Sequence, residues 1–247
     1  QICRPLLERK MQFAIRKDIG KYMSDLKNWL AETAETPPEE MSAFFSARLN
    51  IYEDHMSAWS EGYRKFARLI PDGARRILDL GCGTGLELDE IFLRLPDAEV
   101  TGVDLSADML QRLKEKHPDK DLRLLCADYL SAEFPADSFD AVISFESLHH
   151  FFPEEKRTLY KKLYRCLKRG GVFSLGDYIA CCDEEEALPR GAYEEKRRRF
   201  PSKDRFVHLD IPLTLAHESE LLESAGFCVR PVECVNGATL IRAEKRP

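Results

Sequence analysis

The fold is decided by residues 76–86, which read Arg76-Ile77-Leu78-Asp79-Leu80-Gly81-Cys82-Gly83-Thr84-Gly85-Leu86. The apolar start of this stretch predicts a buried strand, and the three glycines predict a tight turn from which a helix begins. Glycine lets the backbone come close to a ligand, and the free N–H groups at a helix start attract an anion. The stretch therefore predicts a ligand-binding turn at the carboxyl end of a strand in an α/β sheet.

The spacing of the glycines indicates which ligand this turn binds. A dinucleotide-binding turn has glycines at the first, third and sixth places. Here they occupy the first, third and fifth places, Leu86 stands in the sixth, and the acidic Asp79 precedes the turn. This pattern resembles motif I of the class I S-adenosylmethionine (SAM)-dependent methyltransferases, where the bound anion is the methionine carboxylate of the cofactor. The resemblance disfavours an NAD oxidoreductase.

Short apolar runs alternate with amphipathic segments after residue 71, which is typical of an α/β domain. Strands are expected at 76–80, 99–105, 122–127, 141–145, 171–175, 228–235 and 238–243, and helices at 86–95, 107–117, 153–167 and 217–224. The first five strands have crossovers long enough for parallel pairing, whereas only Asn236-Gly237, a hairpin turn signal, separates the last two. The predicted fold is a doubly wound, seven-stranded, mostly parallel sheet with an antiparallel last strand at its end.

Apolar residues recur at helical spacing before the sheet. They predict two amphipathic helices between residues 4 and 35, broken near 18–20, and a further helical stretch over 38–69. We expect residues 1–70 to form a helical cap and residues 71–247 to form the SAM-binding domain, with a lid-like insertion at about 181–216. The cap is rich in aromatic residues, of which Tyr52, Trp59 and Tyr63 are candidates either to cover the cofactor or simply to pack the added helix.

Acidic side chains follow the second and third predicted strands. Asp104 ends the second strand, where a carboxylate can accept both ribose hydroxyls of a nucleotide, although it could instead cap the next helix. Asp128, which could also be a turn residue, and the backbone of Tyr129 resemble the adenine site of the family. The resemblance covers about residues 71–180 and implies SAM as cofactor and S-adenosylhomocysteine (SAH) as product. The implied cofactor site is Tyr52, Asp79, Gly81, Cys82, Gly83, Thr84, Asp104, Leu105, Met109, Asp128, Tyr129, Ser144, Phe145 and Glu146.

Three histidines are candidates for a general base. His149 and His150 follow the fourth predicted strand, beside the expected methyl donor, where a base would be useful. Either imidazole could instead pack in the core or cap the next helix. His208 and Asp210 alternate along an extended part of the insertion, so they lie on one side of it and could supply a base or bind the acceptor.

The insertion also carries a run of basic residues, 196–199. This run could pair with an acidic acceptor or with RNA. The acidic runs 184–186 and 194–195 lie close by in the sequence, and they favour a solvated helix face whose charges pair with one another.

Composition narrows the classes of partner. The formal net charge of the 247-residue chain is −6, which disfavours attraction to phosphate backbones, so nucleic acid is an unlikely partner. The scattered cysteines favour reduced thiols of a cytoplasmic protein. No C-x-x-C pair or catechol-type triad is evident, so no metal is expected, and no apolar run is long enough to span a membrane.

These observations predict a SAM-dependent methyltransferase that acts on a small molecule, as a monomer or homodimer. The sequence does not indicate whether the acceptor atom is O, N or C, and general-base help is optional because positioning contributes much of the rate. Two alternatives stay open. One is a SAM-using enzyme of tRNA modification, either a tRNA methyltransferase or a carboxy-SAM-forming enzyme, and the other is a SAM-binding regulator without turnover.

Overall fold

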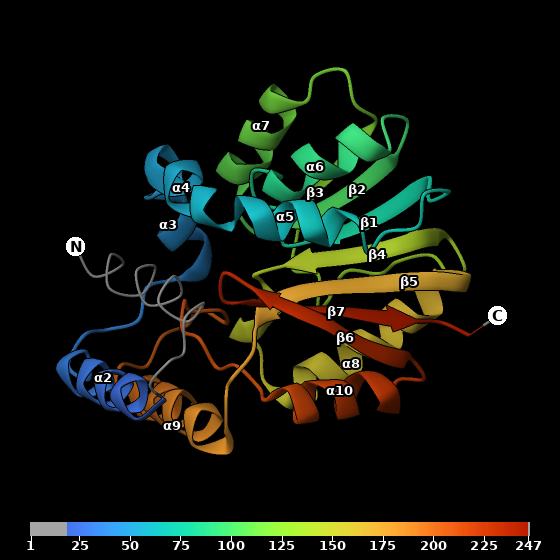
Figure 1. Ribbon diagram of the computed structural model, residues 1–247. Helices are drawn as coiled ribbons and strands as arrows, with labels where there is room; N and C mark the ends of the chain where they lie inside the picture. The colour runs from blue at the N-terminus through green and yellow to red at the C-terminus, as the bar shows by residue number, and fades with distance from the viewer. Residues whose placement is uncertain (1–18, 247) are drawn as a thin grey trace.

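A computed structural model of the chain describes residues 19–246. The first of the two expected N-terminal helices lies outside these residues, and α2 (Ile19–Glu32) begins where the break between the two is expected. Over the described part of the chain, a seven-stranded sheet lies between two layers of helices (Figure 1). The predicted doubly wound α/β fold is confirmed.

Most strands begin and end close to their predicted positions, but β5 extends well beyond its predicted range of 171–175 at both ends. They are β1 (Arg76–Leu80), β2 (Glu99–Asp104), β3 (Leu122–Cys126), β4 (Phe139–Phe145), β5 (Leu167–Tyr178), β6 (Cys228–Val235) and β7 (Ala238–Glu244). Their order in the sheet is β3-β2-β1-β4-β5-β7-β6, and β7 is antiparallel to both of its neighbours. The antiparallel last strand is therefore confirmed. Its predicted place at the end of the sheet is wrong, because β7 lies between β5 and β6 and β6 forms the edge.

The helices cover both faces of the sheet and extend beyond one end of it. They are α3 (Met41–Ser46), α4 (Leu49–Met56), α5 (Ser60–Ala67), α6 (Leu86–Arg94), α7 (Ala107–Lys116), α8 (Pro153–Cys166), α9 (Asp183–Arg199) and α10 (Leu215–Ser224), with short 3₁₀ turns η1 (Ser57–Trp59) and η2 (Leu148–His150). Helices α5, α6 and α7 lie on one face of the sheet, and α8 and α10 lie on the other (Figure 1). No helix among residues 19–246 is long and apolar enough to cross a membrane.

Side chains of β1 alternate between the two layers, as expected for a strand. Ile77 is fully buried against the layer that contains α5 and α6, whereas Leu78 and Leu80 are fully buried against the layer of α8. Burial of each such side chain contributes about 1.5–3 kcal/mol. The same alternation directs the side chain of Asp79 toward α6, which becomes important for the site.

Local capping places two helix N-termini directly after the strand tips. Gly85 adopts a left-handed conformation, with a φ of 72°, immediately before α6. The hydroxyl of Ser106 accepts a hydrogen bond from the backbone N–H of Met109 at 3.3 Å and so caps α7. Helices α6 and α7 therefore begin at the carboxyl edge of the sheet, where their N–H groups face outward.

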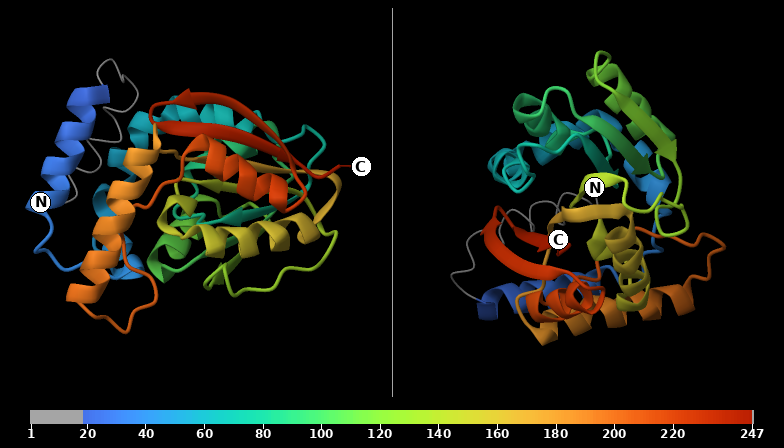
Figure 2. Two further views of the ribbon diagram at one scale, coloured as in Figure 1. Left: turned by 90° about the horizontal axis from the view of Figure 1, so that it is seen from below. Right: turned by 90° about the vertical axis from the view of Figure 1, so that its right-hand side faces the viewer.

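The cap and the insertion meet beyond this edge of the sheet. Helices α3 and α4 lie there, and α2 lies beside α9 (Figure 2). Glu40 forms an antiparallel bridge with Val207, and the backbone N–H of Met41 donates to the carbonyl of Phe206 at 3.2 Å. Two segments that are far apart in the sequence therefore form one cover over the strand tips.

The charged face of α9 is less exposed than its composition suggests. Glu185 is fully buried and accepts a hydrogen bond from Tyr22 of α2 at 2.6 Å. Lys196 is also buried, and its ammonium group donates to the carbonyls of Thr33 and Thr36 at 2.6 and 3.0 Å. The predicted solvated face is therefore wrong at Glu185 and Lys196, because α2 and the loop that follows it cover them.

Candidate functional site

The glycine turn after β1 has the strained conformations that its sequence predicts. Gly81 and Gly83 have φ values of 71° and 47°, which lie in the left-handed region that favours glycine. A Cβ atom at position 81 would clash with the side chain of Ser147. Any other residue at this position would therefore strain the turn and push Ser147 away from it.

Asp104 at the tip of β2 is bound to the glycine turn. Its carboxylate accepts a hydrogen bond from the N–H of Gly83 at 2.9 Å and another from the N–H of Ser106 at 2.8 Å. Burial raises the pKa of Asp104, although these hydrogen bonds oppose that rise. Asp104 thus helps to start α7, as one of the sequence interpretations expects, and its side chain also lines the pocket described below.

Asp79 and Glu87 form a pair of buried carboxyl groups beneath the turn. Neither oxygen of Asp79 accepts a hydrogen bond from a donor among residues 19–246. Burial, together with the nearby Glu87, raises the pKa of Asp79 well above its ordinary value. Burial also raises the pKa of Glu87, to about 7. A positively charged ligand group above the turn would find an acidic partner here.

Asp128, after β3, has two partners. Its Oδ1 accepts a hydrogen bond from the backbone N–H of Leu130 at 2.8 Å, as a turn residue would, and its Oδ2 lies 2.9 Å from Nη1 of Arg205. The hydroxyls of Tyr129 and Ser147 lie 2.8 Å apart, and burial raises the pKa of Tyr129. The tip of β3 is thereby joined both to the insertion and to the loop after β4.

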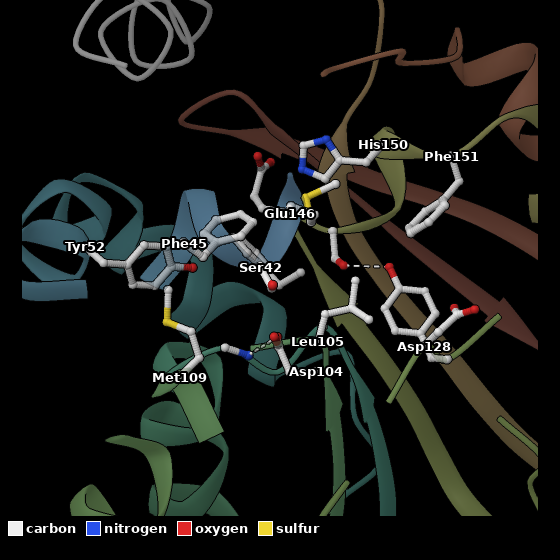
Figure 3. Close-up of a pocket in the computed structure, with 16 residues that line it drawn as sticks. Ser42, Phe45, Tyr52, Asp104, Leu105, Met109, Asp128, Glu146, His150 and Phe151 are labelled. Atoms are coloured by element: carbon white, nitrogen blue, oxygen red, sulfur yellow. Dashed lines mark hydrogen bonds between the residues drawn. The ribbon is translucent and has the colours of Figure 1, made fainter. Parts of the chain in front are cut away.

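These strand tips line one pocket, and Figure 3 shows Asp104 and Met109 on one side of it with Glu146 and His150 on the other. The predicted cofactor-site residues that line it are Tyr52, Gly81, Gly83, Asp104, Leu105, Met109, Asp128, Tyr129, Phe145 and Glu146. The other predicted residues, Asp79, Cys82, Thr84 and Ser144, are buried beneath its wall. The strand-tip prediction therefore brings most of these residues to one place.

Sequence reasoning missed the part of the wall that the cap and the β4–α8 loop supply. The missed lining residues are Met41, Ser42, Phe45, Ser147 and Phe151. Met41 and Phe45 belong to the same helical, aromatic stretch as Tyr52, and that membership is the signal that could have found them. Of the other cap candidates, Trp59 is fully buried in the core and the ring of Tyr63 packs 4.6 Å from that of Phe145.

The tip of β4 shapes the floor of the pocket. The hydroxyl of Ser144 donates to the carbonyl of Leu80 at 2.9 Å, which ties β4 to β1. Glu146 has a φ of 51°, a left-handed conformation that costs a residue other than glycine about 1–3 kcal/mol. Such strained conformations are concentrated at functional sites. The left-handed backbone at Glu146 accompanies the position of this residue in the pocket wall.

The paired histidines have different surroundings. His149 is fully buried, and its Nδ1 lies 2.5 Å from Asp177 while its Nε2 lies 3.4 Å from Asp210. His150 lines the pocket, and its Nδ1 lies 3.0 Å from the carbonyl oxygen of Leu209 and 3.3 Å from Asp210. His150 is therefore the member of the pair that a ligand can reach, with His149 behind it.

His208 lies outside this pocket. Its ring stacks on Phe44 of the cap, with centroids 3.4 Å apart and planes 7° apart, and it is 4.9 Å from the ring of His150. Asp210, in contrast, lies beside both histidines of the pair. Of the two polar residues predicted on the extended segment, Asp210 therefore reaches the histidine pair, and His208 connects the insertion to the cap.

The same side chains could also hold a metal ion. One ligand atom each from His149, His150 and Asp210 lies within 4.8 Å of the other two, and Glu146, His149 and Asp177 form a similar group. Sequence spacing does not show these groups, because Asp177 and Asp210 are distant from the histidine pair along the chain. The expected absence of a metal remains a prediction.

The residues of the pocket fit SAM. The start of α6 suits the cofactor carboxylate, and the acidic pair of Asp79 and Glu87, buried beneath the glycine turn, suits a positive charge above the turn. Asp104 suits the ribose, and Asp128 suits the adenine amine. The cavity itself is small, about 60 Å³, whereas ligand sites commonly measure about 300–1,000 Å³. Side chains that line the cavity must therefore move to admit the cofactor.

Comparison with known proteins agrees with this geometry. The family profile of the methyltransferase domain matches residues 77–171. An uncharacterized methyltransferase of Mycobacterium tuberculosis is 35% identical over 111 residues, which are 45% of this chain and 54% of that protein. A carboxy-S-adenosyl-L-methionine synthase of Helicobacter pylori is 30% identical over 167 residues, which are 61% of this chain and 67% of that protein. This chain thus spans about half to two thirds of the length of these relatives.

The fold comparison extends over more of the chain. The structure of human N-acetylserotonin methyltransferase in complex with SAM aligns with 92% of this chain and 66% of that chain, with a TM-score of 0.65 and 20% sequence identity. The chain belongs to the class I SAM-dependent methyltransferase family. The resemblance noted in the glycine turn is confirmed, and with it SAM as the cofactor of the family.

Proposed function

We propose that this protein transfers the sulfonium methyl group of SAM to a small-molecule acceptor. The supporting observation is that a single pocket is lined by the carboxyl ends of β1, β2 and β3 on one side and by His150 on the other. The cofactor-binding wall and a titratable side chain therefore face each other across the space where transfer would occur.

Each part of the pocket has a role in this proposal. Bound SAM supplies an electrophilic methyl group. Asp104 holds the ribose hydroxyls, while Asp128 and the backbone of Tyr129 hold the adenine. Residues 1–70 act as a cap and the insertion at about 181–216 acts as a lid, and together they exclude water from the pocket. Alignment of the acceptor and removal of water supply much of the acceleration of such a displacement.

His150 is the proposed general base. Its Nδ1 lies 3.0 Å from the carbonyl oxygen of Leu209, which can only accept a hydrogen bond, so Nδ1 carries the proton. The other ring nitrogen, Nε2, is then the one that takes a proton from the acceptor. His149, held by Asp177, positions His150 from behind, and His208 holds the lid against the cap.

The proposal is tested by incubating the full chain with methyl-labelled SAM and a panel of phenols, amines and carboxylic acids. Release of SAH together with label in an acceptor supports transfer, and D104A is the matched variant, in which weaker cofactor binding should reduce both signals at limiting SAM. Tight SAH binding without any acceptor-dependent turnover would instead favour a SAM-binding regulator.

A second candidate function comes from the relative from Helicobacter pylori. Its alignment covers more of this chain than that of the relative from Mycobacterium tuberculosis, and its name describes the formation of a modified SAM. Mass spectrometry of a reaction mixture that also contains a carboxylic acid able to donate its carboxyl group separates the two candidates, because methyl transfer yields SAH whereas that activity would yield a carboxylated SAM. A tRNA substrate receives less support because of the net charge of −6.

The remaining assignments are part of the same proposal. The protein acts in the cytoplasm as a monomer or homodimer. The buried thiols of Cys82 and Cys166 are not in disulfides, which supports a reducing compartment.

A further inference from the structure

A second chamber adjoins the cofactor pocket on the far side of His150. Its volume is about 420 Å³, within the range of small-molecule sites. Met41 and His150 line both spaces, so they form the wall between them. The other lining residues are Phe152, Glu155, Tyr193, Glu194, Arg197, Arg205, Phe206 and Val207.

Aromatic rings form the walls of the second chamber. Phe152 and Tyr193 meet edge to face, with centroids 5.0 Å apart, and Phe206 packs edge to face against Phe151 at 5.6 Å. Burial raises the pKa of Tyr193. Walls of this kind favour a planar ring, which can pack edge to face or in offset stacks against them.

Most charges in the second chamber already have partners. Arg205 lies 2.9 Å from Asp128 and 3.8 Å from Glu155. Glu194 is 3.9 Å from Arg190. Both chamber carboxylates, Glu155 and Glu194, therefore lie within ion-pair distance of an arginine.

Arg197 is different. Its guanidinium donates to the backbone carbonyl of Asp204 at 3.0 Å, and no carboxylate among residues 19–246 lies within 4 Å of it. Its neighbours in the basic run are engaged elsewhere, since Lys196 holds the loop after α2, Arg198 pairs with Glu195, and Arg199 pairs with Glu35. Arg197 is the one residue of this run that lines the second chamber. In the described part of the chain its guanidinium has no carboxylate partner.

We propose that the second chamber binds the methyl acceptor, and that the acceptor is an aromatic carboxylic acid with a nucleophilic hydroxyl. This inference rests on the proposed methyl transfer. The carboxylate would meet Arg197, whose fork of N–H groups matches a carboxylate in two parallel hydrogen bonds. The ring would lie between Phe152, Tyr193 and Phe206, and the hydroxyl would point toward His150 and the cofactor pocket.

The test uses the full chain saturated with SAH and matched pairs of probes, 4-hydroxybenzoate with 4-hydroxybenzamide and 4-hydroxycinnamate with its amide. Calorimetry should show each acid binding at least about tenfold more tightly than its amide, because a charge-assisted hydrogen bond is lost in the amide. In R197Q this ratio should fall to about one through weaker acid binding, with amide binding unchanged. R197K should retain part of the preference.

R198Q is the matched control, because Arg198 lies next to Arg197 on α9 but pairs with Glu195; its ratio should equal that of the original chain. An acid-to-amide affinity ratio near one in the unaltered chain would overturn the inference. Failure of the unaltered chain to bind either probe would overturn it as well. So would a ratio that survives R197Q, or tighter binding of 4-hydroxyphenyl phosphate than of 4-hydroxybenzoate. SAH affinity is measured in every sample. Failure of the unaltered chain to bind SAH would count against the proposed function, and not against the acceptor site alone.

Discussion

The guanidinium of Arg205 lies 2.9 Å from the carboxylate of Asp128, so a residue of the insertion directly contacts the tip of β3. Asp128 lines the cofactor pocket and Arg205 lines the second chamber. One ion pair therefore spans the boundary between the two spaces. Because the Arg205 side chain is 56% exposed, the pair is worth at most about 1 kcal/mol.

The first prediction concerns this pair. R205Q should weaken SAH binding by no more than about fivefold, because only an exposed pair is lost. D128A should weaken it by a further factor of about ten, since the proposed hydrogen bond to the adenine is lost as well. Calorimetry measures both effects. K203Q, a change of an exposed residue in the same segment, is the control, and equal affinity of D128A and R205Q would contradict the adenine assignment.

The second prediction concerns Asp104, the proposed ribose ligand. D104A should lower SAH affinity by about 10–100-fold, because hydrogen bonds to a charged group are worth about 1.5–3 kcal/mol. It should also lower stability slightly, since Gly83 and Ser106 lose their acceptor. Calorimetry and thermal unfolding separate the two effects. D108N, a change at an exposed position in the first turn of α7, should leave SAH affinity unchanged, and unaltered SAH binding by D104A would remove the ribose role.

Features that depend on local conformation or on strand topology are predictable from the sequence. The strand β1 and the turn at Gly81 were predictable because a short continuous apolar run and the conformational freedom of glycine are local properties. The positions of Asp104 and Asp128 followed from topology, since the carboxyl ends of parallel strands meet at one edge.

Features that depend on contacts between distant segments were not predictable. The burial of Lys196 is set by the loop after α2, and the ion pair between Asp128 and Arg205 joins residues that only the folded insertion brings together. The position of β7 inside the sheet depends on its pairing with β5, whereas the hairpin signal at Asn236-Gly237 describes its pairing with β6 alone. The unequal exposure of His149 and His150 likewise depends on side-chain packing.

The third prediction concerns the buried carboxyl of Glu87. Its pKa is about 7 in the folded chain, above the ordinary value of 4.5, so the folded state binds more protons than the unfolded state between these values. Stability without cofactor should therefore fall as pH rises from about 4.5 to 7, by about 1–3 kcal/mol. E87Q should make this decline shallower without abolishing it, because the pKa of Asp79 is raised as well and Asp79 still titrates in the variant. Urea unfolding across pH measures the difference. E90Q, on the same helix, should retain the decline, and an identical pH dependence in E87Q would contradict the assignment.

The fourth prediction concerns entry of the cofactor. Phe45 lines a cavity of only about 60 Å³, so its side chain must move before SAH can bind. F45A should therefore accelerate both association and dissociation of SAH in stopped-flow fluorescence, because less of the cap has to be displaced. I51A alters an exposed apolar residue of the adjacent helix α4 and should leave both rates unchanged. Equal rates in F45A and the unaltered chain would show that the ligand enters by another path.

The fifth prediction concerns a buried ion pair between α8 and α10. Nζ of Lys156 lies 2.6 Å from Glu218, and their side chains are 1% and 0% exposed. Tyr160 also donates a hydrogen bond to Glu218. K156M should destabilise the chain by about 3–5 kcal/mol, because it leaves a buried carboxylate without its cation. The measurement is urea unfolding at neutral pH.

The double variant K156M/E218Q separates loss of packing from loss of charge balance. The substituted side chain at position 218 would be neutral, and its amide oxygen could still accept the hydrogen bond from Tyr160, so the double variant should recover much of the stability that K156M loses. K161M, at an exposed position of the same helix, should cost little. If K156M and the double variant were equally unstable, the unpaired charge of Glu218 would not be the cause of the lost stability. The loss would then arise from the packing contacts of the Lys156 side chain.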